Sequence, residues 1–296
     1  LAGGGRAARE RPGEARPMTF TSLVFALFLA GVFVLHWAAP QRRWQNAVLL
    51  GGSYVFYGWW DWRFAGLMLG ASLLDYCLGR AIAAAPSGGR RRALLGLSLA
   101  ANLGLLGFFK YFNFFADSAA VLLGSLGGNL GTSTLQIVLP VGISFYTFQT
   151  LSYTVDIYRG QFAPRRDVVE YLAFVSFFPQ LVAGPIELAT HLLPQFGKTR
   201  VFAADAAVAG CRLVLWGLVK KMLVADHLGL VVDEIFGRSR SATAPEVLLA
   251  TVGFGFQIYG DFSGYSDIAA GLGRLFGIEL SRNFAFPYFA RSLPEF

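Results

Sequence analysis

Residues 20–39 read FTSLVFALFLAGVFVLHWAA and contain no Asp, Glu, Lys or Arg. A helix of about 20 mostly apolar residues is long enough to cross the hydrocarbon core of a bilayer, so this stretch predicts a membrane-spanning helix. A second run, 93–109, is equally free of charged side chains. Because both runs occur in one chain, the sequence predicts an integral membrane protein built from helices.

The composition of the whole chain agrees with these two runs. Of its 296 residues, 55% are hydrophobic and 15% are charged, whereas about 25% of residues are charged in an ordinary soluble domain. The predicted fold class is therefore all-α, a polytopic transmembrane helical bundle of roughly seven to nine spans, some of them short, broken or re-entrant. Further apolar stretches, interrupted by isolated polar residues, glycine or proline, cover 64–85, 136–158, 171–189, 207–225 and 247–278.

The charged residues between the apolar runs indicate the topology. The formal net charge is +7, but the basic residues form short clusters rather than a continuous stripe, so no nucleic-acid partner is predicted. Clusters at 42–43, 90–92 and 159–166 fall on alternate loops, while the Gly/Ser-rich stretch 116–135 contains no Lys or Arg. Cytoplasmic loops are enriched in Lys and Arg. The basic loops are therefore predicted on the cytoplasmic side, and the N-terminus outside.

Two apolar segments carry polar or helix-breaking residues that a membrane interior tolerates only beside a partner or a cavity. In 139–160, LPVGISFYTFQTLSYTVDIYRG, the Ser, Tyr, Gln and Asp side chains either line a cavity or hydrogen-bond neighbouring helices, and Pro140 and Gly142 favour a helix start. In 177–187, FFPQLVAGPIE, two prolines and a glycine predict a broken or re-entrant segment. The alternative for the second segment is a simple kinked span.

A third segment, 257–267, reads QIYGDFSGYSD and contains two carboxylates, Asp261 and Asp267. Six positions turn a helix by about 600°, so the two carboxylates do not share a face and an acid/base dyad is not predicted. We expect Asp261 to face a polar cavity. The flanking glycines also allow a loop at the membrane surface.

Common catalytic and metal-binding motifs do not occur in the sequence. It has no GxSxG, HExxH, Walker or dinucleotide-binding pattern. Cys77 and Cys211 lack the spacing of metal ligands, so no metal site is predicted. The residues by themselves predict a polytopic protein with a polar cavity inside the membrane.

The three polar segments also carry a family resemblance. Together with the continuation of the third to QIYGDFSGYSDIAAGLGRLFGIELSRNFAFPYFARSLPEF, residues 257–296, they resemble the membrane-bound O-acyltransferase family, and in particular its bacterial alginate O-acetylation branch. The resemblance extends over 18–296. It implies a multi-pass protein of the bacterial inner membrane whose helices surround a tunnel.

The resemblance also implies a reaction. An acyl group passes from a cytoplasmic thioester donor, acetyl-CoA or another thioester, to hydroxyls of an exported polysaccharide such as alginate. No cofactor beyond this donor is expected, and the expected partners are periplasmic polysaccharide-acetylation proteins and the lipid bilayer. Burying the reaction protects the donor from water.

This sequence departs from the family pattern at the catalytic histidine. That histidine belongs to a Trp-Arg-Arg-Trp-His-type motif that follows a Glu-Phe such as Glu295-Phe296, where the chain ends. None of His36, His191 or His227 matches it, so no catalytic residue is assigned. We expect residues 1–17 to be a non-native or disordered extension, and 18–296 to be a C-terminally truncated acyltransferase domain that is inactive alone.

Seven matched positions are predicted to line the cavity, with roles inferred from the resemblance: Gln149, Gln180, Tyr259, Asp261, Ser263, Tyr265 and Asn283. Two alternatives stay open. The first is acylation of another surface polymer, such as teichoic acid or another exopolysaccharide. The second is a non-enzymatic membrane transporter or scaffold, in which the broken segment 177–187 lines a substrate path.

Overall fold

The computed structural model describes residues 18–125, 138–181, 184–185, 187–284 and 287–292. The predicted extension 1–17 and the Glu295-Phe296 pair lie outside these ranges. Within them every regular element is helical, which confirms the all-α class. The elements are α1 (Leu23–Ala38), α2 (Arg42–Gly58), α3 (Trp62–Ala84), α4 (Gly88–Ser125), α5 (Ile143–Tyr158), α6 (Val168–Val175), α7 (Phe178–Leu181), α8 (Ala189–Phe196), α9 (Ala204–Leu218), the π-helix η1 (Val219–Ala225), α10 (Asp226–Gly237), α11 (Ala244–Leu275) and the 3-10 helix η2 (Pro287–Phe289).

Two of the described helices, α3 and α4, are long and apolar enough to cross a membrane. The 23 residues of α3 extend about 34 Å, against a hydrocarbon core of about 30 Å. The apolar helix α1 has only 16 residues, and α11 is long but carries Asp261 and Asp267. The larger number of spans therefore stays a prediction. The stretch 116–135, expected between spans, begins as helix, because α4 continues to Ser125.

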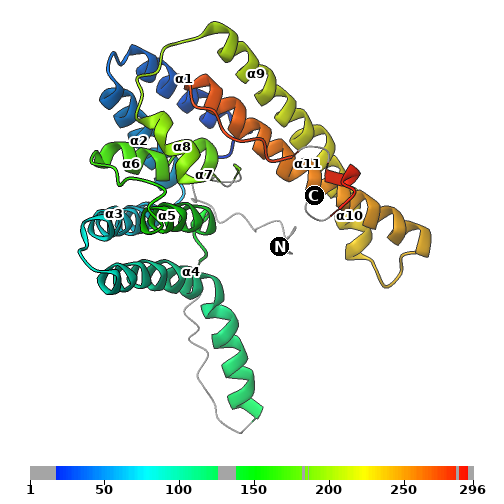
Figure 1. Ribbon diagram of the computed structural model, residues 1–296. Coiled ribbons are helices and arrows are strands. Elements are labelled where there is room, and N and C mark those ends of the chain that lie inside the picture. The colour runs from blue at the N-terminus through cyan, green and yellow to red at the C-terminus, as the bar shows by residue number, and fades with distance from the viewer. Residues whose placement is uncertain (1–17, 126–137, 182–183, 186, 285–286, 293–296) are drawn as a thin grey trace.

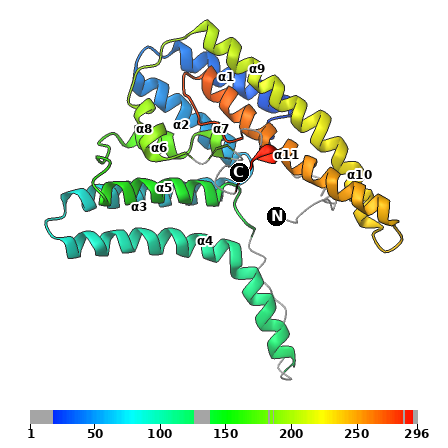
Figure 2. The same ribbon diagram turned by 45° about the vertical axis from the view of Figure 1, so that its right-hand side comes forward.

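The helices form a central body from which two parts extend. In Figures 1 and 2, α3, α5 and the first half of α4 lie side by side, and the second half of α4 extends away from them. The short helices α6, α7 and α8 pack between this layer and α1 and α2. A second long unit consists of α9, η1 and α10 packed along α11.

The predicted break at 177–187 is confirmed and lies in the core. Helix α6 ends at Val175, and α7 has four residues, all of them buried. Phe178 packs against Phe56 and Phe276, with ring centroids 5.7 and 5.8 Å away, and its backbone N–H donates to Ser53 Oγ at 3.1 Å. Backbone groups released by a broken helix are thus satisfied by side chains. The simple kinked span is wrong.

Helix α5 starts where the sequence predicts. Gly142 is its N-cap residue and has a left-handed backbone, with φ of 75°. A Cβ at this position would lie 2.5 Å from the Leu181 carbonyl oxygen. Glycine is therefore required both for the turn and for the close approach of the broken segment.

The basic loops meet at one end of the body, as the alternating pattern predicts. Arg42 and Arg43 lie 3.8 and 3.5 Å from the Asp167 carboxylate, and Arg91 donates to the Tyr158 carbonyl at 2.7 Å. Arg200, in the loop after α8, is buried at the same end; burial and, second, repulsion by Arg42 lower its pKa to about 10. Which side of the membrane this end faces stays a prediction.

A buried polar network joins α3, α4 and α5. The Asp75 carboxylate accepts from Ser98 Oγ at 2.6 Å and from Asn102 Nδ2 at 2.7 Å. Thr150 Oγ1 then donates to Asn102 Oδ1 at 3.2 Å, and Thr154 lies within hydrogen-bonding distance of Ser98. Polar side chains of α5 therefore do connect helices, the role that had been the alternative to lining a cavity.

Replacing Asp75 with alanine is expected to destabilise the fold strongly. Ser98 and Asn102, both buried, would each lose the shorter of their donated hydrogen bonds and keep only those to Thr154 and to the Ser98 carbonyl. Each such loss in a buried network costs about 1–3 kcal/mol. Asp75→Asn keeps one acceptor oxygen and should lose less. Thermal unfolding in detergent measures this, and equal melting temperatures for wild type and Asp75→Ala would contradict it.

Candidate functional site

A pocket of about 550 Å³, called here the polar cavity, lies beside α9 and α11. Helix α11 ends at Leu275, and Gly277, two residues later, has a left-handed backbone (φ 70°) that turns the chain back. The part that follows, residues 279–284, is called here the return segment and forms one wall. The lining consists of Leu213, Trp216, Lys220, Tyr259, Ser266, Asp267, Ala270, Arg274, Leu280, Ser281, Arg282, Asn283 and Phe284.

Two adjacent lysines on η1 bind Asp267 and Asp261 of α11. Lys220 Nζ lies 2.6 Å from Asp267 Oδ2, and Lys221 Nζ lies 2.6 Å from Asp261 Oδ1. Lys220 also donates to Ser263 Oγ at 2.8 Å. The carboxylates thus point to different partners, in agreement with their predicted separation around the helix. Because the whole segment is helical, the surface-loop alternative for 257–267 is wrong.

Tyr259, Ser263 and Asn283 gather around Lys220 and the cavity. The Tyr259 ring lines the cavity, with Lys220 Nζ 5.7 Å from its centroid. Ser263 is buried and connects to the cavity through its bond with Lys220. Asn283, on the return segment, donates to Ser266 Oγ at 3.2 Å. Asp261 lies next to this group in its ion pair with Lys221, outside the set of residues that line the cavity.

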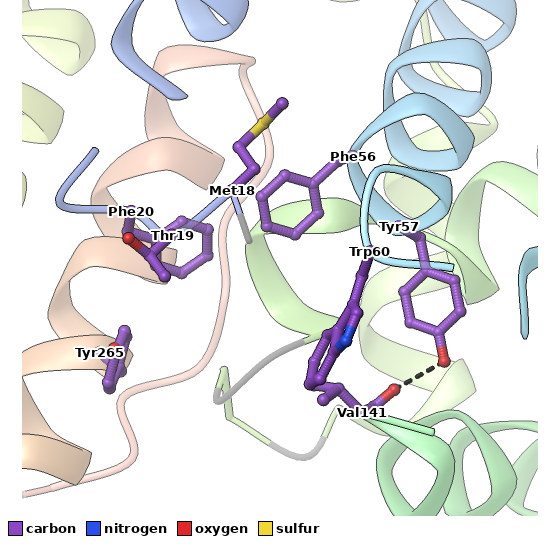
Figure 3. A pocket seen from close by; sticks show the side chains of 8 residues that line it. All are labelled: Met18, Thr19, Phe20, Phe56, Tyr57, Trp60, Val141 and Tyr265. Carbon is purple, nitrogen blue, oxygen red and sulfur yellow. Dashed lines mark hydrogen bonds between the residues drawn. The ribbon is translucent and has the colours of Figure 1, made fainter. Parts of the chain in front are cut away.

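Tyr265 lines a different, smaller pocket of about 90 Å³ (Figure 3). Its walls are mainly apolar and come from the segment before α1, the end of α2 with the turn after it, the segment before α5, and α11. Figure 3 shows the Tyr57 hydroxyl donating to the Val141 carbonyl, at 2.6 Å, beside the ring of Trp60. The lining residues are Met18, Thr19, Phe20, Phe56, Tyr57, Trp60, Val141 and Tyr265.

Gln149 and Gln180 lie in the core, and neither is among the residues that line the two pockets. Gln149 Nε2 donates to the Phe174 carbonyl at 3.0 Å, and Gln180 Nε2 donates to the Pro185 carbonyl at 3.1 Å. Both amides therefore support the broken segment. The expectation that they line a cavity is not met in these two pockets, because their amide hydrogens bond to backbone carbonyls released by the break.

Sequence reasoning missed the lysines and the tight packing that brings them to the carboxylates. A Cβ on Gly217 would lie 2.5 Å from the Gly264 carbonyl oxygen, and one on Gly271 would lie 2.6 Å from the Gly210 carbonyl oxygen. Small residues let membrane helices approach this closely. The signals were available: two lysines inside an apolar stretch need anionic partners, and the contacting glycines are seven residues apart in each helix.

Among the described residues, two apolar helices long enough to cross a bilayer and ion pairs between helices agree with the class of integral membrane proteins. No family model matches it. It is 37% identical over 282 residues to a probable alginate O-acetylase AlgI of Pseudomonas putida (94% of this chain, 57% of that protein). The corresponding protein of Pseudomonas aeruginosa is 39% identical over 282 residues (94% and 53%).

A peptidoglycan O-acetyltransferase of Helicobacter pylori is 31% identical over 292 residues, covering 90% of this chain and 54% of that protein. The chain belongs to the membrane-bound O-acyltransferase family, as the resemblance implies. It spans between 53% and 57% of the length of these relatives.

Proposed function

We propose that the full-length protein containing this chain is a membrane O-acyltransferase that transfers an acetyl group to hydroxyls of an exported polysaccharide, alginate being the first candidate. The observation that carries this is the similarity over 94% of the chain to probable alginate O-acetylases. We place the protein in the bacterial inner membrane as a multi-pass protein, acting with periplasmic acetylation proteins. The charged pairs and broken helix support an enclosed polar interior.

A thioester such as acetyl-CoA is the proposed donor, bound at the polar cavity. The described lining has three cationic side chains, those of Lys220, Arg274 and Arg282, and one carboxylate, Asp267. Because this balance is positive, an anionic group such as a phosphate is favoured. The apolar and aromatic side chains of Trp216 and Tyr259 provide surface for the uncharged part of the donor.

In the transfer, the acceptor hydroxyl oxygen bonds to the acyl carbon, the carbon–sulfur bond breaks, and the hydroxyl proton ends on the departing thiolate, which leaves as the thiol. The residues of this chain would bind the donor, orient its thioester and exclude water. The expected general base is the family histidine, which none of the three histidines of this chain matches.

The function is tested by the acetate on the exported polymer. Disrupting the gene should remove ester-linked acetate from one exported polysaccharide, and restoring the full-length gene should return it. Unchanged ester-linked acetate on every exported polymer would contradict the proposal. Loss from peptidoglycan instead of alginate would select the second acceptor, which the Helicobacter relative favours.

Arg274→Glu is expected to raise the KM for acetyl-CoA about tenfold with little change in kcat, because a bond to a charged group contributes roughly 1.5–3 kcal/mol. The side chain lies at the cavity and is exposed. Arg240→Glu, on the exposed turn between α10 and α11, is the control and should leave KM unchanged. Equal KM values for the two variants would argue against donor binding at this cavity.

A further inference from the structure

The return segment is held by two side chains from the α8 region. Gln195 forms two bonds with the backbone of Glu279: its Nε2 donates to the carbonyl at 2.8 Å, and its Oε1 accepts from the N–H at 2.8 Å. Glu187 Oε1 accepts from the Ser281 N–H and from Ser281 Oγ, the latter at 2.8 Å. The N–H and carbonyl of Glu279 and the N–H of Ser281 therefore find their hydrogen-bond partners in side chains rather than in a neighbouring strand or helix.

Glu187 is suited to this role by its burial and its partners. Its side chain is 1% exposed, and its second oxygen, Oε2, bonds to His191 Nδ1 at 2.7 Å. A buried carboxylate is costly unless donors surround it, and here every bond comes from a different donor group. Hydrogen bonds to an ionised acceptor are also stronger than neutral ones.

We propose that Glu187 and Gln195 form a clamp that positions the return segment as a wall of the polar cavity, so that they act as positioning residues for the donor site. The segment contributes Leu280, Ser281, Arg282, Asn283 and Phe284 to the lining. Glu187 ends the broken segment 177–187. The clamp therefore connects this break in the core to the cavity wall, and its role in donor binding rests on the proposed function.

The position of the wall can be tested without any acyl transfer. In membranes containing the full-length protein, Cys77 and Cys211 are first replaced by serine, because both are free and exposed. The reactivity of Asn283→Cys then measures the exposure of the return segment, and that of Ala270→Cys measures the exposure of the α11 wall of the same cavity. The measurement is the rate of reaction of each cysteine with a water-soluble maleimide.

Glu187→Ala should raise the reaction rate at position 283 about tenfold, because the segment loses two bonds to a charged acceptor. The rate at position 270 should stay the same. Glu187→Gln keeps an acceptor oxygen for Ser281 and should return the rate at 283 towards the starting value, and Gln195→Ala should raise it. Unchanged rates at 283 in both alanine variants would overturn the clamp. So would equal increases at 270 and 283, since they indicate general loosening.

The donor-binding part has its own readout. Releasing the clamp should raise the KM for acetyl-CoA more than it lowers kcat, because the wall orients the donor before the reaction. If the maleimide rates change as expected but the full-length protein transfers no acetyl group, the clamp is supported and the proposed function is contradicted. If transfer occurs with the wild-type KM in Glu187→Ala, the clamp has no role in donor binding.

Discussion

Replacing Gly217 with alanine is expected to lower the free energy of unfolding by about 3 kcal/mol, at the upper end of the cost of overpacking. The added Cβ would lie 2.5 Å from the Gly264 carbonyl oxygen and 2.7 Å from Ile268 Cγ1. Neither α9 nor α11 can move away locally, because Gly210 and Gly271 make a second close contact two turns along the pair. The helices must separate, which also opens the cavity between them.

A second glycine provides the matched control. Gly66 on α3 has no atom within 4 Å of the position that a Cβ would occupy. Gly66→Ala should therefore stabilise the protein by roughly 0.5–1 kcal/mol, the helix preference for alanine over glycine. Thermal unfolding in detergent compares the two variants, and equal stability changes would contradict close packing of α9 against α11.

The second large effect is expected for Asp267→Ala, which should cost about 2 kcal/mol, between the costs of breaking an exposed and a buried ion pair. Lys220 Nζ lies 2.6 Å from the carboxylate, and the side chains are only 17% and 25% exposed. Without Asp267 the ammonium keeps Ser263 Oγ as its hydrogen-bond acceptor. A charge would thus be left in the protein interior without a counter-charge at this position.

The double variant Lys220→Met with Asp267→Leu distinguishes charge pairing from packing. It removes both charges and should recover most of the lost stability, since apolar pairs can replace buried ion pairs at little cost. Binding of acetyl-CoA should be weaker than in the wild type, because the cavity has lost the Lys220 ammonium. A double variant no more stable than Asp267→Ala would show that the ion pair does not explain the effect.

Local features of the fold were predictable from the sequence. Gly142 marks the start of α5, and the Pro/Gly content of 177–187 predicts its break, because these residue types act through their own backbones. The sequence also predicted that the basic loops lie at the same end of the molecule, because positive charge determines on which side of the membrane a loop lies. The different partners of Asp261 and Asp267 follow from helix geometry alone.

Features that depend on pairing between distant segments were not predictable. The pairing of Lys220 with Asp267 requires the register of α9 and η1 against α11, which no single helix specifies. Gln149 and Gln180 were assigned to a cavity because amides are unusual in a membrane, but backbone carbonyls of the broken segment satisfy them instead. The return segment and its clamp depend on the turn at Gly277 and on side chains far earlier in the chain, 84 residues earlier in the Gln195–Glu279 pair.

Photolabelling tests the donor site most directly. Membrane vesicles containing the full-length protein would be irradiated with acetyl-CoA that carries a photoreactive group, and labelled peptides would be identified by mass spectrometry. We predict labelling at peptides of the polar cavity, those containing Trp216 or Asn283, and its suppression by unmodified acetyl-CoA. Saturable labelling confined to other peptides would contradict the assignment of this cavity to the acyl donor.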